Sequence, residues 1–263
     1  MNQRRKVLQT LLGLPLAVAL PAYAKPVPLD MAAAINKAGR QRMLSQRIAK
    51  VHAQLLLNVH TKKALKIMDS SIALFDSQLS ELKAFAPTPE IQGLFTQLAQ
   101  LWTPYRSAAY ATPSTANLKQ VAQLNEAVLK TAHAATVALE KHSGTASARL
   151  VNIAGRQRML SQRAAKFYLF RAAGLTEAEV EKGLADARKE FEAGLVELKK
   201  APQNTEKIKT RLLSAESQWA FLTHALDNYA AGAQNPTYLE YVASSSENVL
   251  EVMDDITQLY QLT

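Results

Sequence analysis

The sequence predicts an all-α protein made of two tandem up-down-up-down four-helix bundles, packed as a pseudo-dimer. The first observation is composition: Ala, Leu, Gln, Glu and Lys are abundant, whereas aromatic residues make up 6% of the 263 residues, a bias toward helix formers. The second is an internal duplication, and the third is the division of each copy into long segments of helical periodicity. The chain is long enough for one or two domains with a buried core.

The first 24 residues have the pattern of a secretory signal peptide (residues 1–24). Basic residues at 4–6 precede an apolar run over 7–20, and Ala22-Tyr23-Ala24 fits a small-x-small cleavage site. The run spans about 14 residues and contains Pro15, so it is short for a membrane span. We expect cleavage after Ala24 and a periplasmic protein exported by the general or the twin-arginine route, the alternative being an uncleaved anchor.

Charge and cysteine content exclude several functional classes. The absence of cysteine excludes a disulfide scaffold, a thiolate metal site and a cysteine nucleophile. Removing three of the 31 basic residues with the signal peptide leaves 28 against 22 acidic residues. Six arginines in the duplicated string account for that excess, and so local a charge suits a small anion better than nucleic acid.

A ten-residue string, AGRQRMLSQR, occurs at 38–47 and again at 154–163, an offset of 116. We call each copy a box. The match extends to Asn36 and Asn152, the same offset pairs Phe75 with Phe191, and an offset of 117 pairs Trp102 with Trp219; residues 126–129 resemble 247–250. The duplication therefore covers both halves of the chain, and we expect one bundle over 25–143 and a second over 144–263.

Turn residues divide each copy into four predicted helices. They cover 29–58, 61–85, 90–110 and 115–141 in the first copy, and 147–173, 177–200, 206–230 and 237–262 in the second. Prolines lie at the breaks, and Thr176 with Glu179 predicts a capping box at the start of 177–200. Helices of about 25 residues are about 37 Å long, which suits a bundle with short loops.

The first helix has two apolar faces: at about 100° per residue, one stripe contains Ile35, Ala38, Arg42 and Ala49, and another contains Leu44, Ile48, Val51 and Leu55. One face can fill its own bundle, and the other is expected to meet the equivalent helix of the second copy. An even number of helices per copy makes these two helices parallel, in a monomer with an internal pseudo-twofold axis. This arrangement places Arg42 opposite Arg158. Arg40 and Arg47 lie on another face, where we expect salt bridges at the surface or the bundle ends.

Two guanidinium groups about 6 Å apart repel by about 3 kcal/mol at an effective dielectric constant of about 20. A bound planar oxyanion would reverse the sign of that interaction, because the flat guanidinium group matches a trigonal anion. Gly39 and Gly155, three residues before the arginines, leave room for such a ligand. The alternative is that each arginine extends to the surface or pairs with a carboxylate of its own bundle.

The segment INKAGRQRMLSQR, residues 35–47, resembles the P-box of NarX/NarQ-type nitrate/nitrite sensor domains and, more closely, the PilJ-type N-terminal domain of chemoreceptors. The resemblance implies four-helix bundles that pair through their first helices and hold one nitrate or nitrite between the box arginines, aided by backbone near the box glycine. It thus implies Arg42, Arg158, Gly39 and Gly155 as ligand-binding residues. The family's transmembrane helices and signalling domain are not found here, and Ile153 replaces Lys37 of the first box, which could make the site asymmetric.

Other residues predict no second site. The five histidines lack metal-ligand spacing, so we expect no metal and no cofactor. Trp102 and Trp219 are expected in the core. The acid pairs Glu177/Glu179 and Asp254/Asp255 are expected at helix starts or on solvated faces. Nucleotide-binding and hydrolase motifs are missing from the sequence, so an enzyme is not expected.

The sequence therefore predicts a soluble periplasmic receptor for a small nitrogen oxyanion, nitrate or nitrite, with one ion per monomer. Such a receptor would pass its signal to a membrane-bound sensor or chemoreceptor, and no nucleic-acid partner is expected. The alternative is a periplasmic adaptor protein of a chemosensory or two-component system that has no ligand of its own.

Overall fold

The computed structural model describes residues 29–228 and 235–263, and within these ranges its regular secondary structure is all helical. The helices are α1 (Met31–Leu56), α2 (Thr61–Phe85), α3 (Pro89–Tyr110), α4 (Thr115–Ser143), α5 (Ala146–Ala172), α6 (Ala178–Lys199), α7 (Glu206–Asp227) and α8 (Pro236–Gln261). The expected helix ends agree within two residues, apart from that of α7, which was expected at Ala230. Ala230 and the expected signal peptide lie outside the described residues.

Most helix starts carry a side chain that caps the first turn. The N-cap side chain accepts a bond from a backbone N–H of the first turn at α1, α3, α4, α5, α7 and α8; these residues are Asp30, Thr88, Ser114, Thr145, Thr205 and Asn235. The expected capping box of Thr176 and Glu179 is wrong. The N-cap of α6 is Glu177, without a side-chain bond, so Glu179 lies one position too early for the reciprocal contact.

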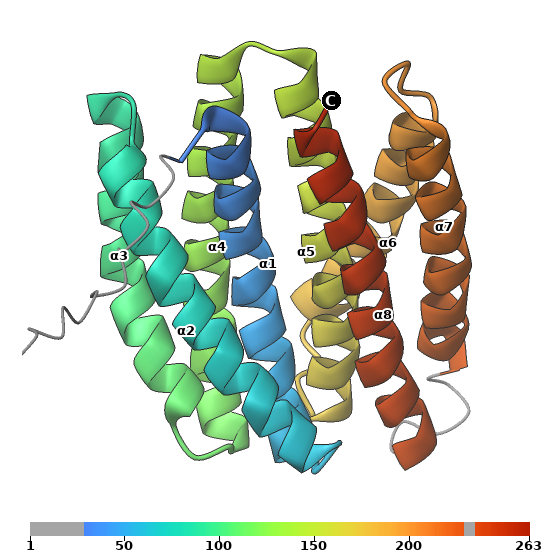
Figure 1. Ribbon diagram of the computed structural model, residues 1–263. Coiled ribbons are helices and arrows are strands. Elements are labelled where there is room, and N and C mark those ends of the chain that lie inside the picture. The colour runs from blue at the N-terminus through green and yellow to red at the C-terminus, as the bar shows by residue number, and fades with distance from the viewer. Residues whose placement is uncertain (1–28, 229–234) are drawn as a thin grey trace, which may run out of the picture.

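The helices form two antiparallel bundles, α1–α4 and α5–α8 (Figure 1). In each bundle the first helix packs against the second and the fourth, and the third packs against the same two. Successive helices run in opposite directions, so α1 and α5 both descend from the top of the view. The expected architecture, two tandem four-helix bundles packed as a pseudo-dimer, is confirmed.

The contact between α1 and α5, which we call the seam, joins the bundles at the centre of the molecule (Figure 1). Each of these helices is covered by its own bundle on one side and by the other bundle on the other. For this reason polar residues of both boxes are buried alongside the apolar ones. In the described ranges, no helix has an apolar stretch long enough to cross a membrane.

Equivalent aromatic stacks fill the two bundle cores. Phe75 stacks on Trp102 with ring centroids 3.8 Å apart, and Phe191 stacks on Trp219 at the same distance. The tryptophans are 4% and 6% exposed, so their expected place in the core is confirmed. The duplication seen in the sequence is thus repeated in the packing.

Candidate functional site

The two box arginines meet at the seam. Arg42 on α1 and Arg158 on α5 are both 0% exposed. Arg42 Nη2 donates to the side chain of Asn152 at 2.7 Å and to its carbonyl at 3.3 Å, and Arg158 Nη2 donates to Asn36 at the same two distances. Each arginine is therefore held by the opposite bundle, and the two are related by a pseudo-twofold axis.

Gly39 and Gly155 leave space for both guanidinium groups. A Cβ on Gly39 would stand 3.1 Å from Arg42 Nη2 and 3.6 Å from Arg158 Nη2. A Cβ on Gly155 would stand 3.1 Å from Arg158 Nη2 and 3.7 Å from Arg42 Nη2. The structure thus brings together all four residues that the sequence proposes for ligand binding, and it explains why side chains larger than glycine would crowd this place.

The arginines differ in the contact made by Nη1. Arg158 Nη1 donates to the Asp254 carboxylate on α8 and forms a salt bridge with it. Arg42 Nη1 lies 3.1 Å from His133 Nδ1 on α4. Because a guanidinium nitrogen only donates, His133 Nδ1 accepts this bond and carries no proton. The alternative of pairing with a bundle carboxylate therefore describes Arg158, whereas Arg42 has a ring nitrogen in that place.

Burial and neighbouring charges disfavour the charged form of Arg42 more than that of Arg158. Desolvation, followed by repulsion from Arg156 and Arg158, lowers the pKa of Arg42 to about 9 despite attraction by Glu140. Desolvation lowers the pKa of Arg158 to about 10, and Asp254 opposes that shift. Both guanidinium groups stay charged at neutral pH. Desolvation and the charges of Arg42 and Arg156 lower the pKa of His133 to about 4, so its ring is neutral at pH 7.

Positive charge exceeds negative charge around the arginine pair. Four arginines of the boxes lie at this level: Arg40, Arg42, Arg156 and Arg158. Three carboxylates act on them, namely Asp254 on Arg40 and Arg158, Glu190 on Arg156, and Glu140 on Arg42. Four arginines against three carboxylates leave one positive charge, and the neutral His133 adds none. A single monovalent anion would balance it.

A hollow of about 240 Å³ between α4, α5 and α6 reaches the buried guanidinium group of Arg42. Its lining also includes His133, the basic side chains of Lys130, Arg156 and Arg163, and the carboxylates of Glu126, Asp186 and Glu190. Lys130 forms no ion pair with any residue in the described part of the chain. A small anion thus has an opening from the surface toward Arg42, lined by four basic and three acidic side chains.

The sequence of each bundle matches a known family. Residues 29–127 and 141–245 both match the profile described as the PilJ, type IV pili methyl-accepting chemotaxis transducer N-terminal domain. Together the two matches cover well over half of the chain. The chain belongs to the PilJ family. PilJ domains are sensory and non-catalytic. Neither the curated proteins nor the solved structures contain a match to this chain.

Two ion clusters connect the PilJ copies across the seam. Glu247 on α8 accepts from Arg47 and Lys50 of α1, and Glu126 on α4 accepts in the same way from Arg163 and Lys166 of α5. Burial alone would raise the pKa of each glutamate, but the lysine and arginine beside it lower the value to about 2. Arg40 and Arg47 do form salt bridges, as expected, but with the opposite bundle rather than at the bundle ends.

Sequence reasoning missed two residues of this PilJ site. The expectation that Asp254 lies on a solvated face is wrong, because it pairs with a fully buried arginine. His133 is one of the five histidines to which the sequence assigned no site, yet it contacts Arg42. A signal exists in the repeat: the offset of 121 that aligns Glu126 with Glu247 also aligns His133 with Asp254.

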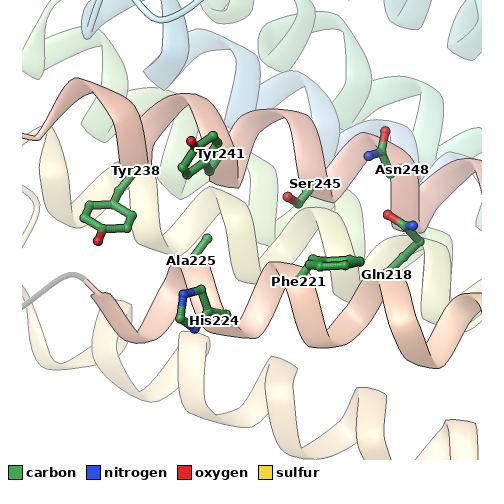
Figure 2. A pocket seen from close by; sticks show the side chains of 8 residues that line it. All are labelled: Gln218, Phe221, His224, Ala225, Tyr238, Tyr241, Ser245 and Asn248. Atoms are coloured by element: carbon green, nitrogen blue, oxygen red, sulfur yellow. The ribbon is translucent and has the colours of Figure 1, made fainter.

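A second hollow, of about 490 Å³, lies between α7 and α8 of the second PilJ copy. Figure 2 shows Phe221 and His224 on α7 facing Tyr238 and Tyr241 on α8 across it. Phe221 is 64% exposed and Tyr241 is 56% exposed. The equivalent positions of the first copy hold Pro104 and Gln120, so this aromatic surface belongs to one copy. It contains no residue of either box.

Proposed function

We propose that this protein is a soluble periplasmic receptor that binds one nitrate or nitrite ion against Arg42 and Arg158. When the ion is bound, the receptor passes the signal to a separate sensor or chemoreceptor in the membrane. Membership of the sensory PilJ family supports the receptor role. The observation that carries the ligand class is the pair of fully buried guanidinium groups with one positive charge in excess around them.

Nitrogen oxyanions fit this site in charge and shape. A guanidinium group offers its donors in one plane, and each charge-assisted bond contributes about 1.5 to 3 kcal/mol. The Nε atoms of both arginines are buried and find no hydrogen-bond partner in the described part of the chain. A small monovalent ion adds acceptors for such donors and removes the repulsion between the arginines.

Calorimetric titration of the mature protein with sodium nitrate and sodium nitrite tests this proposal. We expect saturable heat with one ion per chain, and no such heat with sodium chloride. Arg149→Ala is a matched control for substitution of Arg158. Arg149 lies on α5 like Arg158, but it is exposed and pairs with Glu197. If neither oxyanion produces heat or a thermal shift at millimolar concentration, the receptor proposal is refuted.

A second candidate function is that of an adaptor without a ligand, and the aromatic hollow between α7 and α8 favours it. Exposed Phe221 and Tyr241 would supply apolar contact area to a partner protein. Co-purification from periplasm, with and without nitrate, separates the two functions. Equal capture of one partner in both conditions, by a protein that binds no oxyanion, would favour the adaptor.

A further inference from the structure

The two halves of the arginine site differ in the charge of one equivalent residue. His133 and Asp254 follow Glu126 and Glu247 by seven residues in the last helix of their bundles. His133 contacts Nη1 of Arg42, and Asp254 contacts Nη1 of Arg158. The same place on the two arginines is therefore taken by a neutral ring in one half and by a carboxylate in the other.

The carboxylate of Asp254 already acts as an anion for Arg158. It is planar and carries one negative charge, as nitrate does, and it also accepts from Arg40 Nη2 at 2.7 and 3.1 Å. An added oxyanion at Nη1 of Arg158 would have to displace this side chain or approach a like charge. The second half of the site is thus occupied by the protein itself.

The half around Arg42 has the opposite character. The ring of His133 is only partly buried and lines the hollow between α4, α5 and α6 together with Arg42 and Arg156. Arg156 corresponds to Arg40, but its carboxylate partner is the exposed Glu190 on α6. No carboxylate in the described residues contacts Arg42 directly. The lack of a contacting carboxylate and the opening to the surface therefore both favour anion binding at the half of the site around Arg42.

We propose that the oxyanion binds off the pseudo-twofold axis, where it replaces His133 as the acceptor of Arg42 Nη1, while Asp254 remains the permanent anion of Arg158. The ion enters through the hollow between α4, α5 and α6 as the ring of His133 turns outward. This inference rests on the proposed function and deepens it, because it assigns the ligand to one arginine and gives the other a resident carboxylate.

The decisive variant is His133→Asp, which copies the second half of the site into the first. The new carboxylate should pair with Arg42 as Asp254 pairs with Arg158, and so take the place of the ligand. His133→Asn is the matched control, since asparagine has the same shape without the charge. Calorimetry with sodium nitrate and sodium nitrite should give affinity at least 100-fold weaker for His133→Asp than for His133→Asn, with both variants folded by circular dichroism.

Asp254→Asn provides a second, independent measurement. Removing the carboxylate frees Nη1 of Arg158, so we expect binding to persist and the number of ions per chain to rise from one toward two. Loss of binding in this variant would overturn the inference, as would His133→Asp affinity equal to that of His133→Asn. Either result leaves the proposed function standing if the unmodified protein binds. Absence of binding by the unmodified protein would instead refute the proposed function, and the inference with it.

Discussion

Arg42 of the first bundle donates a 2.7 Å hydrogen bond to the side chain of Asn152 in the second. Arg158 returns the same bond to Asn36 of the first bundle. The two arginines are thus equivalent in their contacts at Nη2, and their difference begins at Nη1, with His133 and Asp254. Because the arginines share a buried seam, the stability of the empty protein and its binding of anions depend on the same few charges.

Removing each arginine should have unequal effects on stability. The repulsion that the sequence predicts between the two guanidinium groups would be relieved equally by removing either arginine. In the structure, however, Arg158 has a carboxylate in contact and Arg42 has none. Removing one partner of a buried salt bridge is destabilising by about 3 to 5 kcal/mol because the other charge is left uncompensated, and Arg42 has no such partner to leave behind. We expect Arg42→Met to melt several degrees above Arg158→Met without ligand, in differential scanning calorimetry. The reverse order would contradict this assignment of charges.

The box glycines should control binding more than folding. Gly39→Ala places a Cβ 3.1 Å from Arg42 Nη2, which must then shift. Alanine adds about 0.5 to 1 kcal/mol of helix propensity, which offsets part of the crowding. We expect Gly39→Ala and Gly155→Ala to fold and to bind nitrate at least tenfold more weakly. Gly93→Ala is the control, because a Cβ there meets no atom within 4 Å. Unchanged affinity in both box variants would show that the ligand does not depend on this space.

The ion clusters across the seam should differ in strength. The side chain of Glu247 is 14% exposed, whereas that of Glu126 is 46% exposed, and each pairs with a buried lysine. Water screens the more exposed pair. We expect Glu247→Gln to lower the free energy of unfolding by about 3 kcal/mol and Glu126→Gln by about 1 kcal/mol, measured by urea denaturation. Equal losses would show that exposure does not determine the strength of these pairs.

His133 should make stability depend on pH. Its pKa is about 4 in the folded protein and near 6.5 when unperturbed, so between these values the unfolded state binds more protons. The contribution of His133 to the free energy of unfolding is therefore fully present above about pH 6.5 and is lost as the pH drops toward about 4. We expect His133→Asn to lose this part of the slope. The paired Glu126 and Glu247 titrate between about 4.5 and 2, so their contribution is lost at lower pH in both proteins. Identical pH profiles above pH 4.5 would contradict the assigned state of His133.

Local sequence determined the helices and their pairing. Prolines and capping residues interrupt each copy at fixed places, and periodicity acts over a few turns, so the helix ends could be predicted within two residues for all but one helix. The seam was also predictable. The first helix of each copy has two apolar faces and must contact a second bundle, which brings Arg42 to Arg158 and Gly39 to Gly155.

Tertiary structure alone decided which groups neutralise the arginines. His133 and Asp254 lie 91 and 96 residues from Arg42 and Arg158 along the chain, and helical periodicity does not specify which residue of a distant helix faces a given position. The rotation and axial shift of α4 and α8 set that contact, and they depend on how whole cores pack. The sequence by itself thus determined two bundles and a pair of opposed arginines. Packing made one arginine carboxylate-bound and left the other beside a neutral ring, because equivalent positions in a duplicated chain need not keep equivalent charges.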